Sequence, residues 1–330
     1  MNRMNLLITG GAGFCGLNIA EHALVQGANV VAYGLESPMP AALRAFADLP
    51  GRFAFHQGNV CDRSQVADAI RQHGITHIVH GAAITAALER EAVQARDILQ
   101  VNTLGTIEVL EAAAAAGIRR MVHLSSGSVF GARVPDTDAL DEAESVPLPD
   151  SLYGISKFAA ERTAMRYRAT RELDVVVARL GVVFGRWEHD TGLRDTLSIP
   201  LQLSELAEQG VPARLNPTLP DDWVYASDVA AAIGSILRAP AEGLQSLYQI
   251  GSGTRWSALD WCARLKQRFP HFDYQSATRA EDINVGVRTP TPRPIFSIRR
   301  LHDDLGYEPR FDPATAFEDY MDWRRVDRSG

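Results

Sequence analysis

The chain has 330 residues, a net charge of −7 and a hydrophobic content of 46%, which is typical of a soluble globular protein with one large or two closely packed domains. The acidic balance and the lack of a basic block argue against a nucleic-acid or membrane partner, because both ligands attract basic surfaces. Its three cysteines, Cys15, Cys61 and Cys262, are too far apart for a zinc site, so we expect no metal. The first apolar run is too short for a signal peptide or a membrane span, which predicts a cytoplasmic protein.

Short β-branched runs alternate with helical patterns through the first half of the chain. Strands are predicted at 6–9, 29–33, 53–57, 77–80, 121–125 and 175–179, and helices at 14–26, 62–73, 93–116 and 152–171. This alternation is typical of an α/β fold in which helices cover both faces of a parallel sheet. Gly117 is predicted to end the long alanine-rich helix. The small residues of that helix suit either tight packing on the sheet or a dimer interface.

Beyond Phe184, glycine and proline become more frequent. We expect a smaller C-terminal substrate-binding lobe there, interleaved with the last elements of the sheet. The predicted sheet domain is 1–185 with about 223–250, and the predicted lobe is 186–222 with 251–330. The segment 288–294, RTPTPRP, is predicted to have no regular structure.

The segment ITGGAGFCG, residues 8–16, joins the first predicted strand to the first helix. Its glycines fit two spacings, Gly10-x-x-Gly13-x-x-Gly16 and Gly11-x-Gly13-x-x-Gly16. In both, a tight turn and a helix N-terminus present backbone N–H groups to a pyrophosphate, and glycine lets the chain approach the phosphates. The strand–turn–helix context predicts a Rossmann-like, doubly wound sheet with a dinucleotide site.

Tyr153 and Lys157 lie four residues apart at the start of a predicted helix, with Asp150 or Ser151 as its N-cap. Residues at this spacing share one helical face. A nearby ammonium lowers a tyrosine's pKa, as a general base that removes a hydroxyl proton requires. Such a pair also occurs by chance on solvated helices.

LSSGSVFG, residues 124–131, follows a predicted strand. Its hydroxyls lie at the carboxyl end of the strand, where open α/β sheets bind their ligands. A serine there could donate to a substrate oxygen, or could form an ordinary serine-rich turn.

Together and in this order, these segments resemble the extended short-chain dehydrogenase/reductase family, the NAD-dependent epimerase/dehydratase group. The other matching pieces are GNVCD (58–62), HGAA (80–83), VNTLGT (101–106), RLGVVFG (179–185) and DWVYASDVA (222–230). The family pattern TGxxGxxG selects the first of the two glycine spacings.

The resemblance implies a role for each matching residue. Tyr153 corresponds to the catalytic base or acid, Lys157 to the residue that lowers its pKa and binds the nicotinamide ribose, and Ser126 to the hydroxyl that polarises the substrate oxygen. The expected cofactor-binding residues are Gly10, Gly13, Phe14, Cys15, Gly16, Asn59, Val60, Gly81, Ala82, Ala83 and, unless its role is structural, Asn102. The resemblance also implies a homodimer packed through the helices near 93–116 and 152–171.

The end of the second strand bears on the choice of dinucleotide. Gly34 stands where the resemblance places an acid that selects NAD. Glu36 follows Gly16 by twenty residues, a spacing that can still reach a ribose 2′-hydroxyl. No Arg or Lys lies between Val30 and Leu43 to bind a 2′-phosphate. The sequence therefore favours NAD over NADP.

Three departures from the family concern the substrate. Gly127 and Ser128 follow the catalytic serine where related dehydratases carry acids. Val182 and Asp221 stand where nucleotide-sugar epimerases carry an Asn and an Arg for the diphosphate. An anionic side chain such as Asp221, in place of a cationic one, should repel a diphosphate.

We therefore expect a smaller polyhydroxylated substrate, such as a sugar, a sugar acid or a lactone. The candidate substrate-binding residues are Thr85, Ser126, Ser128 and Arg194. The arginine could bind a carboxylate bidentately, or it could pair with Asp190 or Asp195 at the surface.

The predicted function is an NAD(P)-dependent oxidoreductase, with NAD as the favoured cofactor, that removes a hydride from a secondary alcohol of such a compound. The alternative enzyme is a UDP- or dTDP-sugar epimerase using the same Ser126, Tyr153 and Lys157. A non-catalytic cofactor-sensing protein is a third possibility, but a sensor would not need an intact general base.

Overall fold

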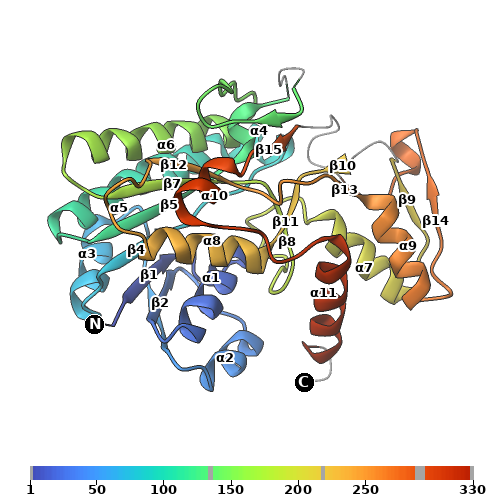
Figure 1. Cartoon of the computed structure of the whole chain (residues 1–330), viewed down its shortest axis with the longest axis horizontal. Helices are drawn as coiled ribbons and strands as arrows, with labels where there is room; N and C mark the ends of the chain where they lie inside the picture. Colours follow the sequence, from blue (N-terminus) through green and yellow to red (C-terminus); the bar gives the residue numbers. More distant parts are fainter. Residues whose placement is uncertain (1–2, 133–136, 217–219, 287–293, 328–330) are drawn as a thin grey trace.

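The computed structural model describes residues 3–132, 137–216, 220–286 and 294–327. Its centre is a parallel sheet of seven strands in the order β12-β7-β5-β4-β1-β2-β3 (Figure 1). The strands are β1 (Asn5–Thr9), β2 (Asn29–Gly34), β3 (Arg52–Gln57), β4 (His77–His80), β5 (Arg120–Ser126), β7 (Val175–Leu180) and β12 (Leu247–Ile250). The order reverses beside β1, and such a point is where open α/β sheets bind ligands.

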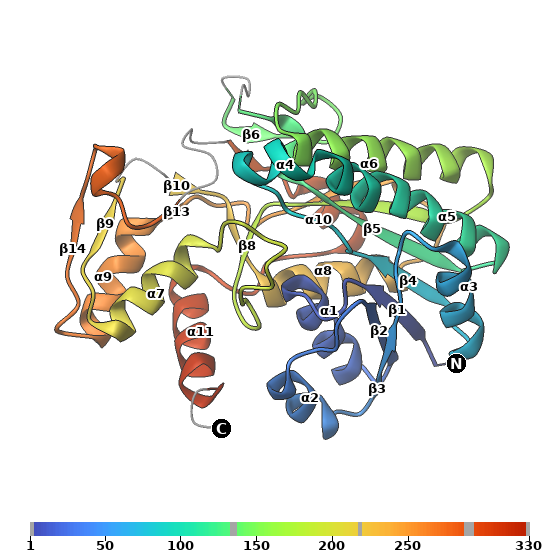
Figure 2. The same ribbon diagram turned by 180° about the vertical axis from the view of Figure 1, so that it is seen from behind.

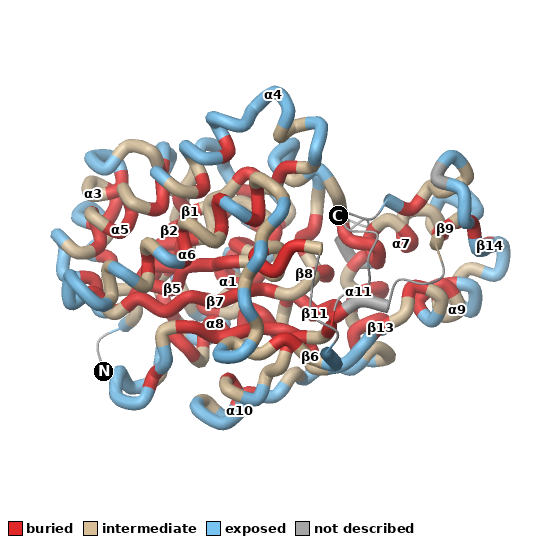
Figure 3. The backbone as a smooth tube through the Cα atoms, turned by 90° about the horizontal axis from the view of Figure 1, so that it is seen from above, coloured by how far each residue is buried: buried red, intermediate tan, exposed pale blue. Residues whose placement is uncertain are grey.

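Helices cover both faces of this sheet. Successive strand residues point to opposite faces, so Leu6 and Ile8 pack with α1 (Phe14–Val25) and α8 (Ala226–Arg238), whereas Leu7 packs toward the other side. The helices on that second side are α3 (Arg63–Gln72), α5 (Gly105–Ala115) and α6 (Leu152–Thr170). Figure 3 shows β5 and β7 as continuously buried segments. Burial on both sides explains the apolar run VVVA in β7, whereas β5, RMVHLSS, also carries polar side chains that are buried.

The remaining elements extend the molecule beyond one end of the sheet (Figure 2). They include α7 (Ile199–Gln209), α9 (Ala258–Arg268), α11 (Pro313–Asp327) and the short strand pairs β9–β14 (Ala213–Leu215, Tyr274–Ser276) and β10–β13 (Pro220–Asp221, Trp256–Ser257). They share an aromatic core in which the ring of Phe184 lies 5.3 Å from that of Trp261. The strands β8 (Val182–Phe184) and β11 (Trp223–Tyr225) pair in parallel and lead into this core.

The six strands predicted from the sequence are all present, and β12 adds a seventh strand to the sheet. The sequence reading missed α2 (Pro40–Ala47), a short helix that begins with a proline in its first turn. The smaller elements are η2 (Gly127–Phe130), η3 (Ala280–Asp282), α10 (Arg299–Leu305) and the pair β6–β15 (Ala139–Leu140, Ile295–Phe296). The predicted irregular segment 288–294 lies outside the described residues except for Pro294. The proposed domain boundaries stay a prediction.

The helix predicted over 93–116 is present, but it begins earlier and is not a regular α-helix throughout. The structure has α4 (Leu88–Leu99), a π-helical turn η1 (Gln100–Leu104) and then α5. The cause is Asn102, whose amide bonds both the backbone N–H and the carbonyl of Ile84 and donates to Ser156 Oγ at 3.0 Å. A π-turn inserts an extra residue and turns this side chain inward. Gly117, with φ of 64°, does end α5 as predicted.

None of the described helices combines the length and the apolar character that a membrane span needs.

Candidate active site

A cavity of about 830 Å³ follows the carboxyl ends of the central strands. It begins at the glycine turn after β1, passes the ends of β2, β4 and β5, and reaches the segment after β7. This cavity is therefore at the edge of the sheet where this fold class binds its ligands.

The glycine turn is shaped by close backbone contacts. Gly10 has φ of 68°, and a Cβ there would lie 2.9 Å from the amide nitrogen of Ala82. A Cβ on Gly16 would lie 2.4 Å from the carbonyl oxygen of Gly10, so a side chain there would push α1 away from the turn. Gly11 is constrained too, because its Cβ would lie 2.6 Å from the carbonyl oxygen of Ile8. The structure thus adds Gly11 to the three glycines that the family pattern selects.

The N-terminus of α1 can accept an anion. Residues 12–16 line the cavity, Gly13 is the N-cap without a side-chain hydrogen bond, and the first turn contains no acidic residue. The first N–H groups of a helix lack intrahelical acceptors and carry the positive end of its dipole. The turn therefore fits the pyrophosphate of a dinucleotide.

The other predicted cofactor residues lie along the same cavity. Asn59 and Val60 line it, as do the small residues Gly81, Ala82 and Ala83. The hydroxyl of Tyr33 donates to the carbonyl of Asn59 at 3.1 Å, which ties this turn to the end of β2.

The end of β2 lines the adjoining part of the cavity. Glu36 is exposed there. A Cβ added to Gly34 would meet nothing within 4 Å, so the glycine leaves open space where the family resemblance places an acid.

Ser126 and Tyr153 line the cavity from two different elements. Ser126 ends β5, and its Oγ accepts a hydrogen bond from the N–H of Ser128 at 3.1 Å, which leaves the serine proton to donate elsewhere. Tyr153 lies in the first turn of α6, which is capped by Ser151, whose Oγ accepts from the N–H of Gly154. Of the two predicted N-cap candidates, Asp150 and Ser151, the N-cap in the structure is Ser151.

Lys157 lies one helical turn beyond Tyr153 and is 3% exposed. It is not among the residues that line the cavity. Burial lowers the pKa of Lys157, while the neighbouring Tyr153 and Glu161 raise it again. The ammonium is therefore held close to the tyrosine that the sequence assigns as the base.

A buried ion pair supports α6 against the sheet. Arg179 Nη2 lies 2.5 Å from Glu161 Oε1, and both side chains are almost fully buried. Ser125 Oγ also donates to Glu161 at 2.9 Å, and the guanidinium lies over the ring of Phe130, 5.0 Å from its centre. This network fixes the helix that carries the tyrosine and the lysine.

Two histidines lie behind the catalytic residues. His80 is hydrogen-bonded to Thr9 at 2.7 Å and to Thr106 at 2.9 Å. The ring of His123 lies 5.4 Å from that of His80, and neither of its nitrogens has a hydrogen-bond partner in the described part of the chain. Burial lowers the pKa of His80 to about 3 and that of His123 well below its usual value, and the charge of Lys157 adds to both shifts. Both rings are therefore neutral in the folded protein.

Asn102 does not line the cavity. It is 1% exposed, and its hydrogen bonds to Ile84 and Ser156 hold the turn after β4 against α6. The structure favours the structural role for this residue over direct cofactor binding.

The predicted substrate-binding residues lie near a segment that crosses the cavity. We call residues 186–198 the strap. The N–H of Thr85 donates to the carbonyl of Leu193 at 2.8 Å, and the N–H of Asp195 donates back to Thr85 at 3.2 Å. Asp195 is paired with Arg90 of α4 at 2.6 Å. Ser128 also lines the cavity, beside Ser126.

Arg194 lines the cavity, but its predicted surface pairing is wrong. It forms an ion pair with Glu188 at 2.8 Å, rather than with Asp190 or Asp195. Glu188 is buried and also accepts hydrogen bonds from the backbone N–H and the hydroxyl of Ser198. The guanidinium lies over the ring of Phe14, 5.5 Å from its centre.

Sequence reasoning missed two further residues at the substrate end of the cavity. A Cβ on Gly127 would lie 3.0 Å from Cζ of Phe296, so an aromatic ring occupies the space beside the catalytic serine. Asp222 lines the cavity and accepts from the N–H groups of Phe296 and Ser252. Asp222 belongs to the matched segment DWVYASDVA and could have been noted there, whereas Phe296 follows a segment without any recognisable motif.

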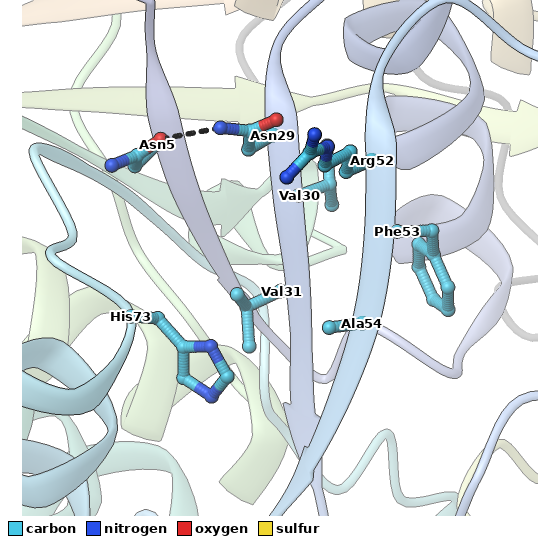
Figure 4. Close-up of a pocket in the computed structure, with 8 residues that line it drawn as sticks. All are labelled: Asn5, Asn29, Val30, Val31, Arg52, Phe53, Ala54 and His73. Carbon is cyan, nitrogen blue, oxygen red and sulfur yellow. Dashed lines mark hydrogen bonds between the residues drawn. The ribbon is translucent and has the colours of Figure 1, made fainter.

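A second, smaller hollow lies at the opposite edge of the sheet (Figure 4). It is formed at the amino ends of β1, β2 and β3, and in it the Asn29 amide donates to Asn5 at 2.9 Å. None of the predicted catalytic or cofactor residues lines it.

Comparisons with known proteins agree with this geometry. Residues 6–251 match the family described as NAD dependent epimerase/dehydratase family. A dTDP-glucose 4,6-dehydratase of Streptomyces niveus is 29% identical, with 99% of this chain and 94% of that protein covered. A UDP-glucose 4-epimerase of Mus musculus is 26% identical, with 98% of each covered.

Solved structures show the same fold. A UDP-glucose 4-epimerase of Thermotoga maritima with UDP-glucose has a TM-score of 0.81 at 22% identity, with 98% of this chain and 99% of that chain covered. A dTDP-glucose 4,6-dehydratase of Streptomyces venezuelae, solved with NAD bound, has a TM-score of 0.77 at 26% identity, with 99% and 98% covered. The chain belongs to the NAD dependent epimerase/dehydratase family and is an NAD-dependent enzyme of the extended short-chain dehydrogenase/reductase type.

Proposed function

We propose that the protein is an NAD-dependent oxidoreductase that acts on a secondary alcohol of a small polyhydroxylated compound, such as a sugar, a sugar acid or a lactone. The observation that carries this proposal is that Ser126 and Tyr153 line the same cavity as the glycine turn, with no acidic side chain at the two positions after the serine. Oxidation of an alcohol needs a base and a hydrogen-bond donor, but it does not need the acid of a dehydratase.

When bound, NAD supplies the acceptor for the hydride that leaves the alcohol carbon. The phenolate of Tyr153 takes the hydroxyl proton, and the ammonium of Lys157 favours that phenolate electrostatically. Ser126 donates a hydrogen bond to the oxygen as it becomes a carbonyl, because its own acceptor position is occupied by the N–H of Ser128. The negative charge that develops on the substrate oxygen is thus stabilised by a hydrogen-bond donor already in place.

The substrate end of the cavity favours a compound without a diphosphate. Val182, which lines it, replaces an amide by an apolar side chain. Among the described residues that line the cavity, Arg194 is the one Lys or Arg, and its guanidinium lies over Phe14 at the glycine turn, so the described lining has no further Lys or Arg for the diphosphate of a substrate. The ring of Phe296 fills the space next to Gly127, where an acidic side chain would need room. These contacts support oxidation of a small substrate over dehydration of a nucleotide sugar.

Glu36 is the proposed ligand of the adenosine ribose 2′-hydroxyl, and the proposed cofactor preference is therefore NAD over NADP. The carboxylate is exposed at the cavity's edge, where it would repel a 2′-phosphate. Replacing Glu36 by Gln should reduce the preference for NAD, measured as the ratio of kcat/KM with the two cofactors. An unchanged ratio would remove Glu36 from this role.

A nucleotide-sugar epimerase is the second candidate. It is favoured by the relatives, since the Mus musculus protein is a UDP-glucose 4-epimerase and nearly its whole length is covered. Such an epimerase would use the same Ser126, Tyr153 and Lys157, and would return the hydride to the opposite face of the ring.

A screen of substrates separates the two. Purified protein is mixed with NAD or NADP and with hydroxy acids, aldonates, uronates, lactones and UDP- or dTDP-sugars. Net NADH formation at 340 nm with a small polyhydroxylated compound is the expected result. Epimerised nucleotide sugar without net NADH would overturn the proposal in favour of the epimerase.

We further propose a homodimer formed through α4, η1 and α6. Five large apolar side chains on these elements are exposed: Leu88 (77%), Val93 (79%), Leu99 (39%), Leu104 (52%) and Ile155 (45%). Apolar side chains gathered on neighbouring helices are typical of an interface. Light scattering should give the mass of a dimer, and Val93→Glu should shift it toward the monomer; a monomeric wild-type protein would refute this.

A further inference from the structure

The side chain of Arg194 was expected to bind a carboxylate of the substrate, yet its position indicates another ligand. We propose that Arg194 reaches from the strap to the glycine turn and binds the pyrophosphate of the dinucleotide. The inference rests on the proposed function only in that a dinucleotide must bind.

The first observation is where the guanidinium lies. It lies over the ring of Phe14, 5.5 Å from the ring centre, and Phe14 is the first residue of α1. Its charge also acts on the next residue: burial raises the pKa of the Cys15 thiol to about 11, and the positive charge of Arg194 opposes that shift. The arginine therefore lies at the helix end where the uncapped N–H groups are directed at an anion.

The second observation is the charge balance of the cavity. The glycine turn supplies backbone donors but no formal charge, whereas a pyrophosphate carries negative charge on both of its phosphates. Arg194 is the one Lys or Arg among the described residues lining the cavity. A planar guanidinium has several donors in a fixed arrangement and suits phosphate oxygens.

The third observation is that the guanidinium is held from one side and open on the other. Nη1 of Arg194 forms an ion pair with the carboxylate of Glu188 at 2.8 Å. Hydrogen bonds from Ser198 hold that carboxylate in place. The side chain of Arg194 remains 24% exposed. One edge of the guanidinium is thus oriented by a buried carboxylate, which leaves the remaining donors for a ligand in the cavity.

The backbone around Arg194 is fixed on the far side of the cavity. Thr85 pairs with the strap at residues 193 and 195, and Arg90 bonds both the carboxylate of Asp195 and the carbonyl of Gly192 at 2.8 Å. The side chain spans from this anchor to α1, so a bound dinucleotide would lie under the strap. A substrate ligand would instead be expected near Ser126 and Tyr153.

The test is a binding series that does not depend on turnover. Affinities of adenosine, AMP, ADP-ribose and NAD are measured by calorimetry for the wild type and for Arg194→Gln. The variant should bind ADP-ribose and NAD about 10- to 100-fold more weakly, while adenosine, which has no phosphate, should bind equally to both proteins. Arg194→Lys should recover part of the loss, because it restores the charge without the planar fork.

Arg90→Gln is the matched control, since it also removes an arginine that holds the strap but does not line the cavity. It should weaken all four ligands by less than about fivefold and without regard to phosphate. If Arg194→Gln binds ADP-ribose as tightly as the wild type, or if Arg90→Gln reproduces the phosphate-dependent loss, the inference is wrong.

Two outcomes separate this inference from the proposed function. A higher KM for the substrate with unchanged NAD affinity would make Arg194 a substrate ligand and would overturn the inference alone. Wild-type protein that binds neither ADP-ribose nor NAD would overturn the proposed function itself, and the pyrophosphate role with it.

Discussion

The sheet and the strap position their functional groups in different ways. Ser126 and Tyr153 belong to β5 and α6, whose places are set by apolar burial and by backbone pairing within the sheet. The strap has no regular structure between Arg186 and Ser198. Partly exposed polar contacts hold much of it, such as Asp195 with Arg90 and Arg186 with Asp319 of α11. Its apolar anchor is Trp187, which is buried against Phe46 and Trp323.

This difference indicates which part of the site is less sensitive to salt and to substitution. Burial in a close-packed core stabilises strongly and is insensitive to salt. Partly exposed ion pairs are weak individually and are screened by salt. We therefore expect changes in the sheet half to affect turnover and folding, and changes in the strap to affect mainly ligand affinity.

The largest effect should come from Tyr153→Phe. The variant keeps the aromatic ring and removes the group that takes the proton, so kcat should fall by about 100- to 10,000-fold. The affinity for NAD should stay near that of the wild type, as calorimetry can show. Turnover at the wild-type rate would remove Tyr153 from the mechanism.

The buried ion pair behind α6 gives the second largest effect. Glu161→Gln leaves Arg179 without its charged partner in the core, and should lower the free energy of unfolding by about 3–5 kcal/mol in urea titrations. The double variant Glu161→Leu with Arg179→Met should recover much of that loss, because it removes both charges. If the double variant is as unstable as the single one, lost packing and not the unpaired charge is the cause.

Acid should destabilise the sheet half through its buried histidines. His80 and His123 have folded pKa values far below those of the unfolded chain. Between those values the unfolded state binds more protons, so stability falls as the pH drops below about 6.5, by roughly 1 kcal/mol per pH unit for each histidine.

The matched variant is His123→Leu, which removes two buried nitrogens without partners in the described structure. Its unfolding free energy should fall less steeply between pH 6.5 and pH 5 (a range set by the ordinary histidine pKa of about 6.5) than that of the wild type. Equal slopes would mean that His123 does not contribute to acid sensitivity.

The smallest effect on stability should come from the strap. Asp195→Asn weakens the pair with Arg90, which is partly exposed, and should change the free energy of unfolding by less than about 1 kcal/mol. At low salt, the variant should have a higher KM for the substrate than the wild type. This difference should become smaller at high salt, where the ion pair is screened in both proteins. A large loss of stability would show that the strap belongs to the folding core.

Much of the sheet half could be predicted from the sequence because its signals are local. Strand runs, the glycine turn and the i, i+4 pair of Tyr153 and Lys157 are each short patterns with one structural outcome. The prediction of a regular α-helix through Asn102 failed because the deviation there depends on contacts that are not local. The π-turn there serves contacts with Ile84 and Ser156, which are far away in sequence.

The sequence by itself determined the fold, the family and the three candidate catalytic residues. Tertiary structure decided what surrounds them: that Phe296 fills the space beside Gly127, and that Arg194 pairs with Glu188 and lies over Phe14. Periodic burial leaves a pattern along the chain, whereas contacts between irregular segments depend on where the completed sheet places them. The substrate side of this protein is built from such contacts.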